Sequence, residues 1–493
     1  DCAVERLNLL DRNEITFQEK IIRGSLEARK IDHLKGKIIN FSVSIKQKTA
    51  KKKVNFIKKK QLESVGLQIC EELWDEAIIS KKSRPEWLGI EPSGNFTSYR
   101  FGLLGSSIYS GKIGIALAMA RSALVYSDPS LELSKAWQER ASACIEHLDE
   151  TDLEYSNTVI PRAINKKPLG IMGLGGTLLG LYLLEEAKIY KADYLVDKLL
   201  ANLRQDIIME DICLDILGGV AGLIGPLLLI GTSRSMELAF TCGERLLALQ
   251  QENGSWARNG DQTAAEITAL LGPYPQTIGS KRRSLETCAT SFCYGSSGIA
   301  AALGRLAQST NHEQFKNAAR KALVYEREEQ NKMKNVTSNA LTKSSRRWKP
   351  EPWGEGSSGM ILSRVIMQHA NLKDEATISE IDIARREIKK IVKEYEVNSQ
   401  FDNSFASGPL GLECLLSIES GINQGESGET QKQKDCNKIK KINFANYQNL
   451  NKEKQAFPDQ LGLFTGKSGV ALWMFEQHSN LNWLKHILTA GLL

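Results

Sequence analysis

The chain has 493 residues, of which 42% are hydrophobic and 25% are charged, and its formal net charge is +6 at pH 7. This balance is typical of a globular protein with a buried core. No stretch approaches the roughly 20 uncharged apolar residues of a membrane span, and the start of the chain lacks the basic and apolar segments of a secretory signal. We therefore expect a cytoplasmic protein without a membrane span.

The first 60 residues are expected to be the tail of a preceding domain. The chain does not begin with Met, which suggests that it was cut from a longer polypeptide. Residues 46–60 are rich in lysine. Because no recognisable nucleic-acid-binding module accompanies this segment, we interpret it as a solvated basic linker and expect no nucleic-acid partner.

The cysteines give no sign of a disulfide framework. Nine of them are scattered along the chain without a CxxC pair, and several lie on apolar faces of expected helices. This distribution favours reduced, buried thiols, which agrees with a cytoplasmic protein.

From residue 61 onward the chain is dominated by a repeated glycine motif. Two glycines separated by two residues recur at intervals of about 45 to 75 residues, and each pair opens an apolar run. Such self-similarity is typical of repeat architectures. The seven pairs occupy residues 111–114, 173–176, 219–222, 295–298, 356–359, 408–411 and 466–469.

Two classes of helix are expected around these motifs. Segments after each glycine pair are apolar on nearly all sides and are expected to be buried. Segments between the motifs have apolar residues at three- and four-residue steps, which is typical of amphipathic helices. Examples of the amphipathic segments are residues 62–79, 192–208, 234–251 and 313–330.

The two classes predict an all-α fold, an α/α toroid of seven helical hairpins over residues 61–493, with apolar helices inside and amphipathic helices outside. Residues 421–455 are rich in Asn, Gln and Lys and are expected to be a disordered insertion. The glycines, which lack a Cβ atom, would let the loops crowd together at the mouth of the toroid. Free N–H groups of the inner helices would favour anionic or thiolate ligands there.

The glycine motifs and their surroundings resemble the lanthionine cyclase family, and more specifically the C-terminal cyclase part of a class II lanthipeptide synthetase (LanM type). The segments that carry the resemblance are residues 87–117, 215–228 and 462–472. Residues 17–26 are similar to the end of the dehydratase half of these synthetases. The resemblance implies a domain that adds a cysteine thiol of a dehydrated ribosomal precursor peptide across a dehydroamino acid, forming a thioether ring. The implied partners are the precursor peptide and a dehydratase domain or subunit.

The resemblance also implies a metal site that this sequence lacks. In the family, two cysteines and a histidine hold a zinc ion, which ionises the substrate thiol. Those three positions are occupied here by Gly354, Ala406 and Ser407, and none of these side chains is a usual zinc ligand. A further family histidine corresponds to Tyr294, whereas an aspartate of the third loop is retained as Asp215. We therefore expect neither zinc nor another cofactor.

These substitutions leave open whether the chain is an active enzyme. A metal-independent cyclase would use Asp215 or Glu355 to accept the thiol proton and Tyr294 to donate to the enolate. The residues expected to contact the peptide are Trp353, Cys293 and Ser407.

Two other interpretations remain at this point. One is a catalytically inactive peptide-binding or scaffolding protein of the same fold, in which Asp215 caps an inner helix and Tyr294 packs in the mouth. The other is an α/α-barrel carbohydrate enzyme with Asp215 and Glu355 as opposed carboxylates and Trp353 as a stacking surface. The glycine motifs argue against the carbohydrate enzyme.

Overall fold

The computed structural model describes most of the repeat region. The described residues are 15, 17–26, 29, 59–79, 85–92, 99–126, 128, 130–146, 148, 168–211, 213–256, 290–340, 353–354, 356–395, 404–406, 408–422, 461–476 and 483–493. The basic segment 46–60 and the expected insertion 421–455 lie almost wholly outside these residues.

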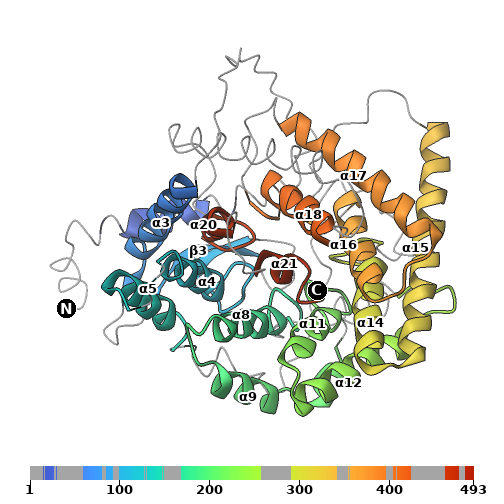
Figure 1. The fold of residues 1–493 in the computed structure, drawn as a ribbon, viewed down its shortest axis with the longest axis horizontal. Coiled ribbons are helices and arrows are strands. Elements are labelled where there is room, and N and C mark those ends of the chain that lie inside the picture. The colour runs from blue at the N-terminus through green and yellow to red at the C-terminus, as the bar shows by residue number, and fades with distance from the viewer. Residues whose placement is uncertain are drawn as a thin grey trace, which may run out of the picture.

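One helix follows each of the seven glycine motifs, and together these helices form an inner ring (Figure 1). The first six contact one another in chain order, and α20 contacts α4. Every residue of α4 is buried, as expected for a helix that is apolar on nearly all sides. The inner helices are α4 (Lys112–Ala123), α8 (Leu174–Glu186), α11 (Ala221–Ile230), α14 (Ser296–Thr310), α16 (Gly356–His369), α18 (Pro409–Ile422) and α20 (Lys467–Glu476).

Amphipathic helices form an outer layer around this ring. The outer helices are α5 (Glu132–Ala143), α9 (Asp193–Asn202), α10 (Gln205–Met209), α12 (Ser233–Leu249), α15 (Glu313–Ala340) and α17 (Glu375–Tyr395). Apart from the short α10, which packs on α12, each contacts the inner helix that precedes it, because only its apolar face can be removed from water. The segment in which the outer partner of α18 was expected lies outside the described residues.

The ring is closed by a helix from the opposite end of the chain. Helix α3 (Lys59–Asp75) packs on α20 and supplies the outer partner of this last inner helix (Figure 1). The contact is tight, since a Cβ atom at Gly66 would lie 2.7 Å from the ring of Phe475. Lys467 also donates to Glu76 at 2.8 Å. The predicted α/α toroid is therefore confirmed, and pairing between distant parts of the chain completes it.

One predicted helix is divided in the structure. Residues 192–208 were expected to form a single amphipathic helix, but they form α9 and α10 with a break at Leu203. The carbonyl of Leu203 accepts a hydrogen bond from Arg234 of α12 at 3.0 Å instead of continuing the helix. Arg204 then binds Asp206 through two hydrogen bonds, at 2.9 and 2.7 Å, at the start of α10.

Short strands connect α3 to α4. Strand β1 (Ile78–Ile79) pairs with β2 (Pro85–Glu86), and β3 (Leu88–Pro92) pairs with β4 (Tyr99–Leu103), both antiparallel. Between them Trp87 is fully buried, and its indole N–H donates to the carbonyl of Leu73 at 2.7 Å. This tryptophan anchors the strands to the outer helix that closes the ring.

The centre of the toroid is filled by the last described segment. Helix α21 (Trp483–Leu488) lies inside the ring in Figure 1. Residues 487–493 are all buried. A Cβ atom at Gly225 of α11 would lie 2.1 Å from the carbonyl oxygen of Ala490. Only a residue without a side chain permits this approach.

Two expectations about composition can be checked on the described residues. Five of the six described cysteines are buried, and burial raises the pKa of the Cys70 thiol to about 12. The burial that the sequence predicted for the thiols is therefore confirmed for these five cysteines. Among the described helices, none combines the length and the apolar character needed to cross a membrane.

Candidate active site

The loops that precede the inner helices are joined by backbone hydrogen bonds in a series that runs from the loop before α8, through the loop before α20, to the loop before α4. We number the loops one to seven in chain order. We call the residues that make these bonds the collar: Tyr109, 169–172, 216–218, 292–293, 353–354, Ala406 and Phe464. The donor and acceptor pairs are Phe464 N to Tyr109 O (2.9 Å), Ala406 N to Phe464 O (2.8 Å), Trp353 N to Ala406 O (2.7 Å), Phe292 N to Gly354 O (2.9 Å), Leu217 N to Cys293 O (3.3 Å) and Ile171 N to Ile216 O (3.1 Å).

The second glycine of every motif permits this arrangement. In each repeat this glycine lies directly against a carbonyl oxygen of the loop that precedes the helix. A Cβ atom built on the glycine would lie between 1.9 and 2.8 Å from that oxygen. A side chain at any of these positions would push the loop away from the collar. The oxygens belong to Ile108, Ile171, Ile216, Phe292, Gly354, Phe405 and Leu463.

The N-terminal ends of the inner helices have fewer free backbone N–H groups than the sequence suggested. The expectation was that such free groups at the mouth of the toroid would favour anions or thiolates. Several of these groups already donate to carbonyls of their own loops. Examples are Lys112 to Gly105 at 2.8 Å and Gly175 to Leu169 at 2.9 Å. Polar chemistry at the collar therefore depends on side chains more than on helix ends.

Asp215 lies at the start of loop three, next to the collar. Its Oδ1 accepts a hydrogen bond from the backbone N–H of Gly218 at 2.7 Å, which closes the turn leading into α11. The side chain is half-buried. Burial raises the pKa of this carboxyl to about 6, although the Gly218 N–H opposes the shift. Such a group is ionised at neutral pH and is still basic enough to accept a proton.

The raised pKa of Asp215 predicts a pH dependence of stability. The folded protein holds this proton up to about pH 6, whereas the unfolded chain releases it near pH 3.9. The stabilisation by the protonated form is thus complete below the unfolded pKa and is lost as pH rises through about 6. We expect Asp215→Asn to become more stable relative to wild type between pH 4 and 7, by at most about 3 kcal/mol at about 1.4 kcal/mol per pKa unit. Urea unfolding across this range measures the difference.

Asp374 provides the control for this experiment. Arg327 and Thr377 hold its carboxylate and lower its pKa, so the ionised form stabilises the fold. Asp374→Asn is expected to lose stability relative to wild type as pH rises to about 4, and to run parallel to wild type between pH 4 and 7. Parallel curves for Asp215→Asn and wild type would show that the Asp215 carboxyl is not perturbed.

Tyr294 lies on loop four, next to the hydrogen bond that joins loops three and four. Leu217, two residues after Asp215, donates to the carbonyl of Cys293, the residue before Tyr294. The Tyr294 side chain is 44% exposed, and its backbone N–H donates to Ser291 Oγ at 3.1 Å. Asp215 and Tyr294 thus flank one junction of the collar. The structure places these two predicted residues on adjacent loops.

Trp353 and Cys293 are collar residues whose side chains are buried. Trp353 is buried, and its indole N–H donates to the carbonyl of Leu488 in α21 at 3.1 Å. Its ring packs against Phe464 and Phe292, with centroid distances of 4.7 and 6.0 Å. Cys293 is also buried, and its thiol donates to the Trp353 carbonyl at 3.0 Å. A direct contact of either residue with a peptide stays a prediction.

The described zinc-ligand positions of the family lie together but carry no donor side chain. Trp353 N–H binds the carbonyl of Ala406, so loops five and six are adjacent, and Gly354 has a φ of 77°. Glu355 and Ser407 lie outside the described residues. Within the described part of the chain, no group of three or more His, Cys, Asp or Glu side chains could hold a metal ion. The residues present therefore do not fit the zinc site that the family resemblance implies.

None of the described histidines is a member of the collar. His369 ends inner helix α16, at the opposite end from loop five. His312 packs against Phe240 and Phe315 at the turn before α15. His486 lies in α21, and burial lowers its pKa to about 4. These surroundings are typical of structural histidines.

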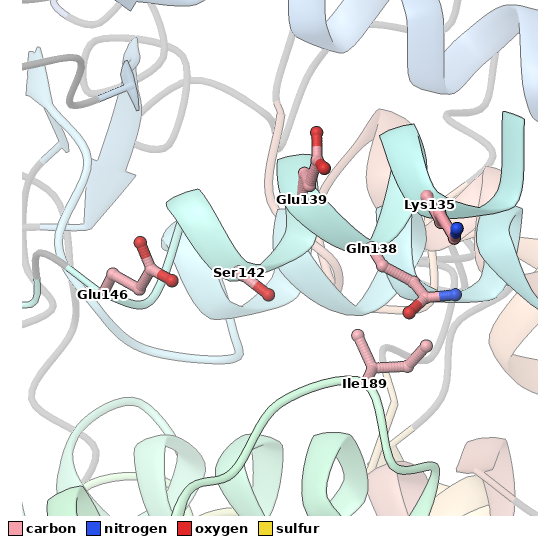
Figure 2. A pocket seen from close by; sticks show the side chains of 6 residues that line it. All are labelled: Lys135, Gln138, Glu139, Ser142, Glu146 and Ile189. Atoms are coloured by element: carbon pink, nitrogen blue, oxygen red, sulfur yellow. The ribbon is translucent and has the colours of Figure 1, made fainter. Parts of the chain in front are cut away.

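A groove on the outer layer is separate from this site. It lies between α5 and the connection from α8 to α9 (Figure 2). None of its residues belongs to the collar or was singled out by the sequence. The lining residues are Lys135, Gln138, Glu139, Ser142, Glu146 and Ile189.

Comparison with known proteins gives one family and one fold. The family model described as "Lanthionine synthetase C-like protein" matches residues 102–488. Among solved structures, nisin cyclase is similar with a TM-score of 0.54 and 15% sequence identity, and the match covers 88% of this chain and 97% of that one. A search of curated protein sequences finds no match. The structural similarity supports the helical toroid.

Proposed function

Because the chain belongs to the lanthionine synthetase C-like protein family, we propose that it forms thioether rings in a dehydrated ribosomal precursor peptide without using zinc. The observation that carries this proposal is the junction of loops three and four. It holds Asp215, whose carboxyl has a pKa of about 6, and the exposed Tyr294 on adjacent loops of the collar. The carboxylate of Asp215 would accept the thiol proton, and the hydroxyl of Tyr294 would donate to the enolate.

The reaction is a net addition of S–H across a carbon–carbon double bond. The Asp215 carboxylate accepts the proton of the peptide thiol, and the sulfur bonds to the β-carbon of the dehydroamino acid. The π electrons move onto the carbonyl oxygen, and the Tyr294 hydroxyl donates a hydrogen bond to this enolate. The protonated Asp215 then delivers its proton to the α-carbon. Nothing is oxidised or reduced.

The rate can come from positioning, because dehydroamino acids are already electrophilic. A thiol with a pKa of about 8.5 is only about 3% ionised at pH 7, which corresponds to a loss of roughly 2 kcal/mol relative to full ionisation. Holding a thiol and an alkene together can compensate for much more than this loss. The collar supplies a frame for such positioning, since backbone hydrogen bonds join loops two to seven in series and loop seven to loop one.

Further parts of the proposal rest on the sequence resemblance. We propose that the chain corresponds to the C-terminal part of a class II synthetase acting in the cytoplasm, with a dehydratase domain or subunit as a partner. Residues 1–60 would then be the tail of that dehydratase. Lys20, within the helical residues 17–26, pairs with Glu76 at 3.3 Å, so part of this tail contacts the toroid.

The cyclase proposal predicts a loss of activity at two positions. A synthetic peptide containing one dehydroamino acid and one cysteine is incubated with the protein, and ring formation is followed by alkylation of the remaining thiol and mass spectrometry. Asp215→Asn is expected to lower the rate by about 100-fold or more, because it removes the proton acceptor. Tyr294→Phe is expected to lower it by about 10-fold, as loss of one hydrogen bond to a charged oxygen does.

Tyr194 offers a matched control for Tyr294. It lies on outer helix α9 and is 74% exposed, so Tyr194→Phe should leave the rate unchanged. If the wild-type protein does not accelerate ring formation over buffer, or if Asp215→Asn is as fast as wild type, the catalytic proposal is wrong.

A second candidate is a non-catalytic protein that binds the precursor peptide or stabilises a dehydratase. One observation favours it: Asp215 already has a structural role, because its Oδ1 closes the turn at Gly218. Peptide binding by the wild type without acceleration would support this candidate. The carbohydrate-enzyme interpretation finds no support in the family match.

A further inference from the structure

We infer that the thiol of Cys293 occupies the space of a side chain at residue 354, so that atoms of loop four fill the space that a metal ligand at residue 354 would need. The inference concerns the zinc-independent part of the proposed function. It is tested by stability and metal content, so its failure and a failure of the cyclase proposal can be told apart.

The central observation is a steric one. A Cβ atom built on Gly354 would lie 2.1 Å from Cys293 Sγ, and 3.4 Å from both Cβ and N of Cys293. Non-bonded heavy atoms in protein interiors meet at about 3.5–4 Å. The sulfur therefore lies almost at bonding distance from the position that a side chain at residue 354 would have to use.

Cys293 and Gly354 cannot move apart without breaking hydrogen bonds. The N–H groups of Phe292 and Cys293 both donate to the Gly354 carbonyl, at 2.9 and 3.1 Å. The Cys293 thiol donates to the Trp353 carbonyl at 3.0 Å. On the other side, a Cβ atom at Gly359 would lie 2.3 Å from the Gly354 carbonyl oxygen, so α16 lies directly behind this oxygen.

The same contact opposes a metal-binding side chain at residue 354. The family uses a cysteine at position 354, but here the backbone of Gly354 has a φ of 77°, which L side chains rarely adopt. The thiol at 293 belongs to the neighbouring loop and is buried. A single sulfur does not provide the three or four donors that zinc requires. The Cys293 thiol thus fills the contact between loops four and five without forming a metal site.

A double-mutant cycle at residues 293 and 354 tests the inference. Gly354→Ala is expected to lower the melting temperature by several degrees when Cys293 is present. In a Cys293→Ala background the same substitution should cost less than half as much, because the colliding sulfur is gone and only the backbone strain remains. Equal losses in both backgrounds would overturn the inference.

Gly231 supplies a matched control for the backbone strain. Its φ is 68°, but the nearest atom to a Cβ built there is 3.7 Å away. Gly231→Ala should therefore show the cost of a left-handed residue alone, and this cost should be the same in the wild-type and Cys293→Ala backgrounds. If Gly354→Ala yields no folded protein, recovery by Cys293→Ala is the expected result, and no recovery overturns the inference.

Metal analysis gives an independent readout. Wild type and Gly354→Cys, both purified from zinc-supplemented medium without chelators, are expected to contain far less than one zinc per chain. Stoichiometric zinc in either protein would show that the junction can open around a metal, and would overturn the inference whatever the cyclisation assay reports.

Discussion

Replacing Arg364 by methionine is expected to lower the free energy of unfolding by about 3–5 kcal/mol, the usual cost of leaving one member of a buried ion pair alone. Arg364 lies in inner helix α16, and its side chain is fully buried. It donates to Glu326 of α15 and to Glu380 of α17, both at 2.7 Å. Methionine has a similar volume, so the loss would be electrostatic. Denaturant unfolding provides the measurement.

The effect depends on the burial of Glu326. Its side chain is only 3% exposed, so without Arg364 its charge has little access to water. The double variant Arg364→Met with Glu326→Gln should recover part of the loss, because it removes the unpaired charge. Lys390→Met, which breaks an exposed pair with Glu387 on α17, should cost no more than about 0.5 kcal/mol. Comparable losses at residues 364 and 390 would contradict a buried ionic cluster.

Gly298→Ala is expected to destabilise the protein by about 3 kcal/mol, at the upper end of the cost of overpacking. A Cβ atom at this second glycine of loop four would lie 1.9 Å from the Phe292 carbonyl oxygen. Relief by movement of the loop is opposed, since Phe292 N–H donates to Gly354 in loop five. The melting temperature and the free energy of unfolding in denaturant measure the loss.

Gly102 in strand β4 is the control for Gly298. A Cβ atom built there has no heavy atom within 4 Å, and its φ is not in the left-handed range. Gly102→Ala should therefore change the free energy of unfolding by less than about 0.5 kcal/mol. If Gly298→Ala is equally harmless, the collar does not depend on the close approach of loop and helix.

Much of the fold could be predicted because it follows from local patterns. The run after residue 111 is apolar on all sides, and α4 is indeed wholly buried. The period of residues 234–251 predicted an amphipathic helix, and α12 spans Ser233–Leu249. Such patterns indicate which surface must leave water, and that requirement does not depend on distant residues.

The candidate site was predictable only in part. The repeated glycines placed Asp215 and Tyr294 on loops three and four, and the resemblance singled them out. The sequence could not show that the Asp215 carboxyl is half-buried or that its pKa is raised, because both depend on the packing of neighbouring loops. The separation of 192–208 into two helices was also missed, since it follows from a carbonyl contact with Arg234.

The sequence by itself determined the class of each helix, the number of motifs and the absence of Cys or His at residues 354, 406 and 407, because these follow from residue type and spacing. Only the tertiary structure decided that α3 closes the ring against α20, that Arg364 lies between two glutamates and that the Cys293 sulfur occupies the space beside Gly354. Each of these is a contact between residues at least 16 positions apart. Chain spacing does not encode such contacts, which arise when the ring packs and backbone atoms of one loop come to lie against side chains of another.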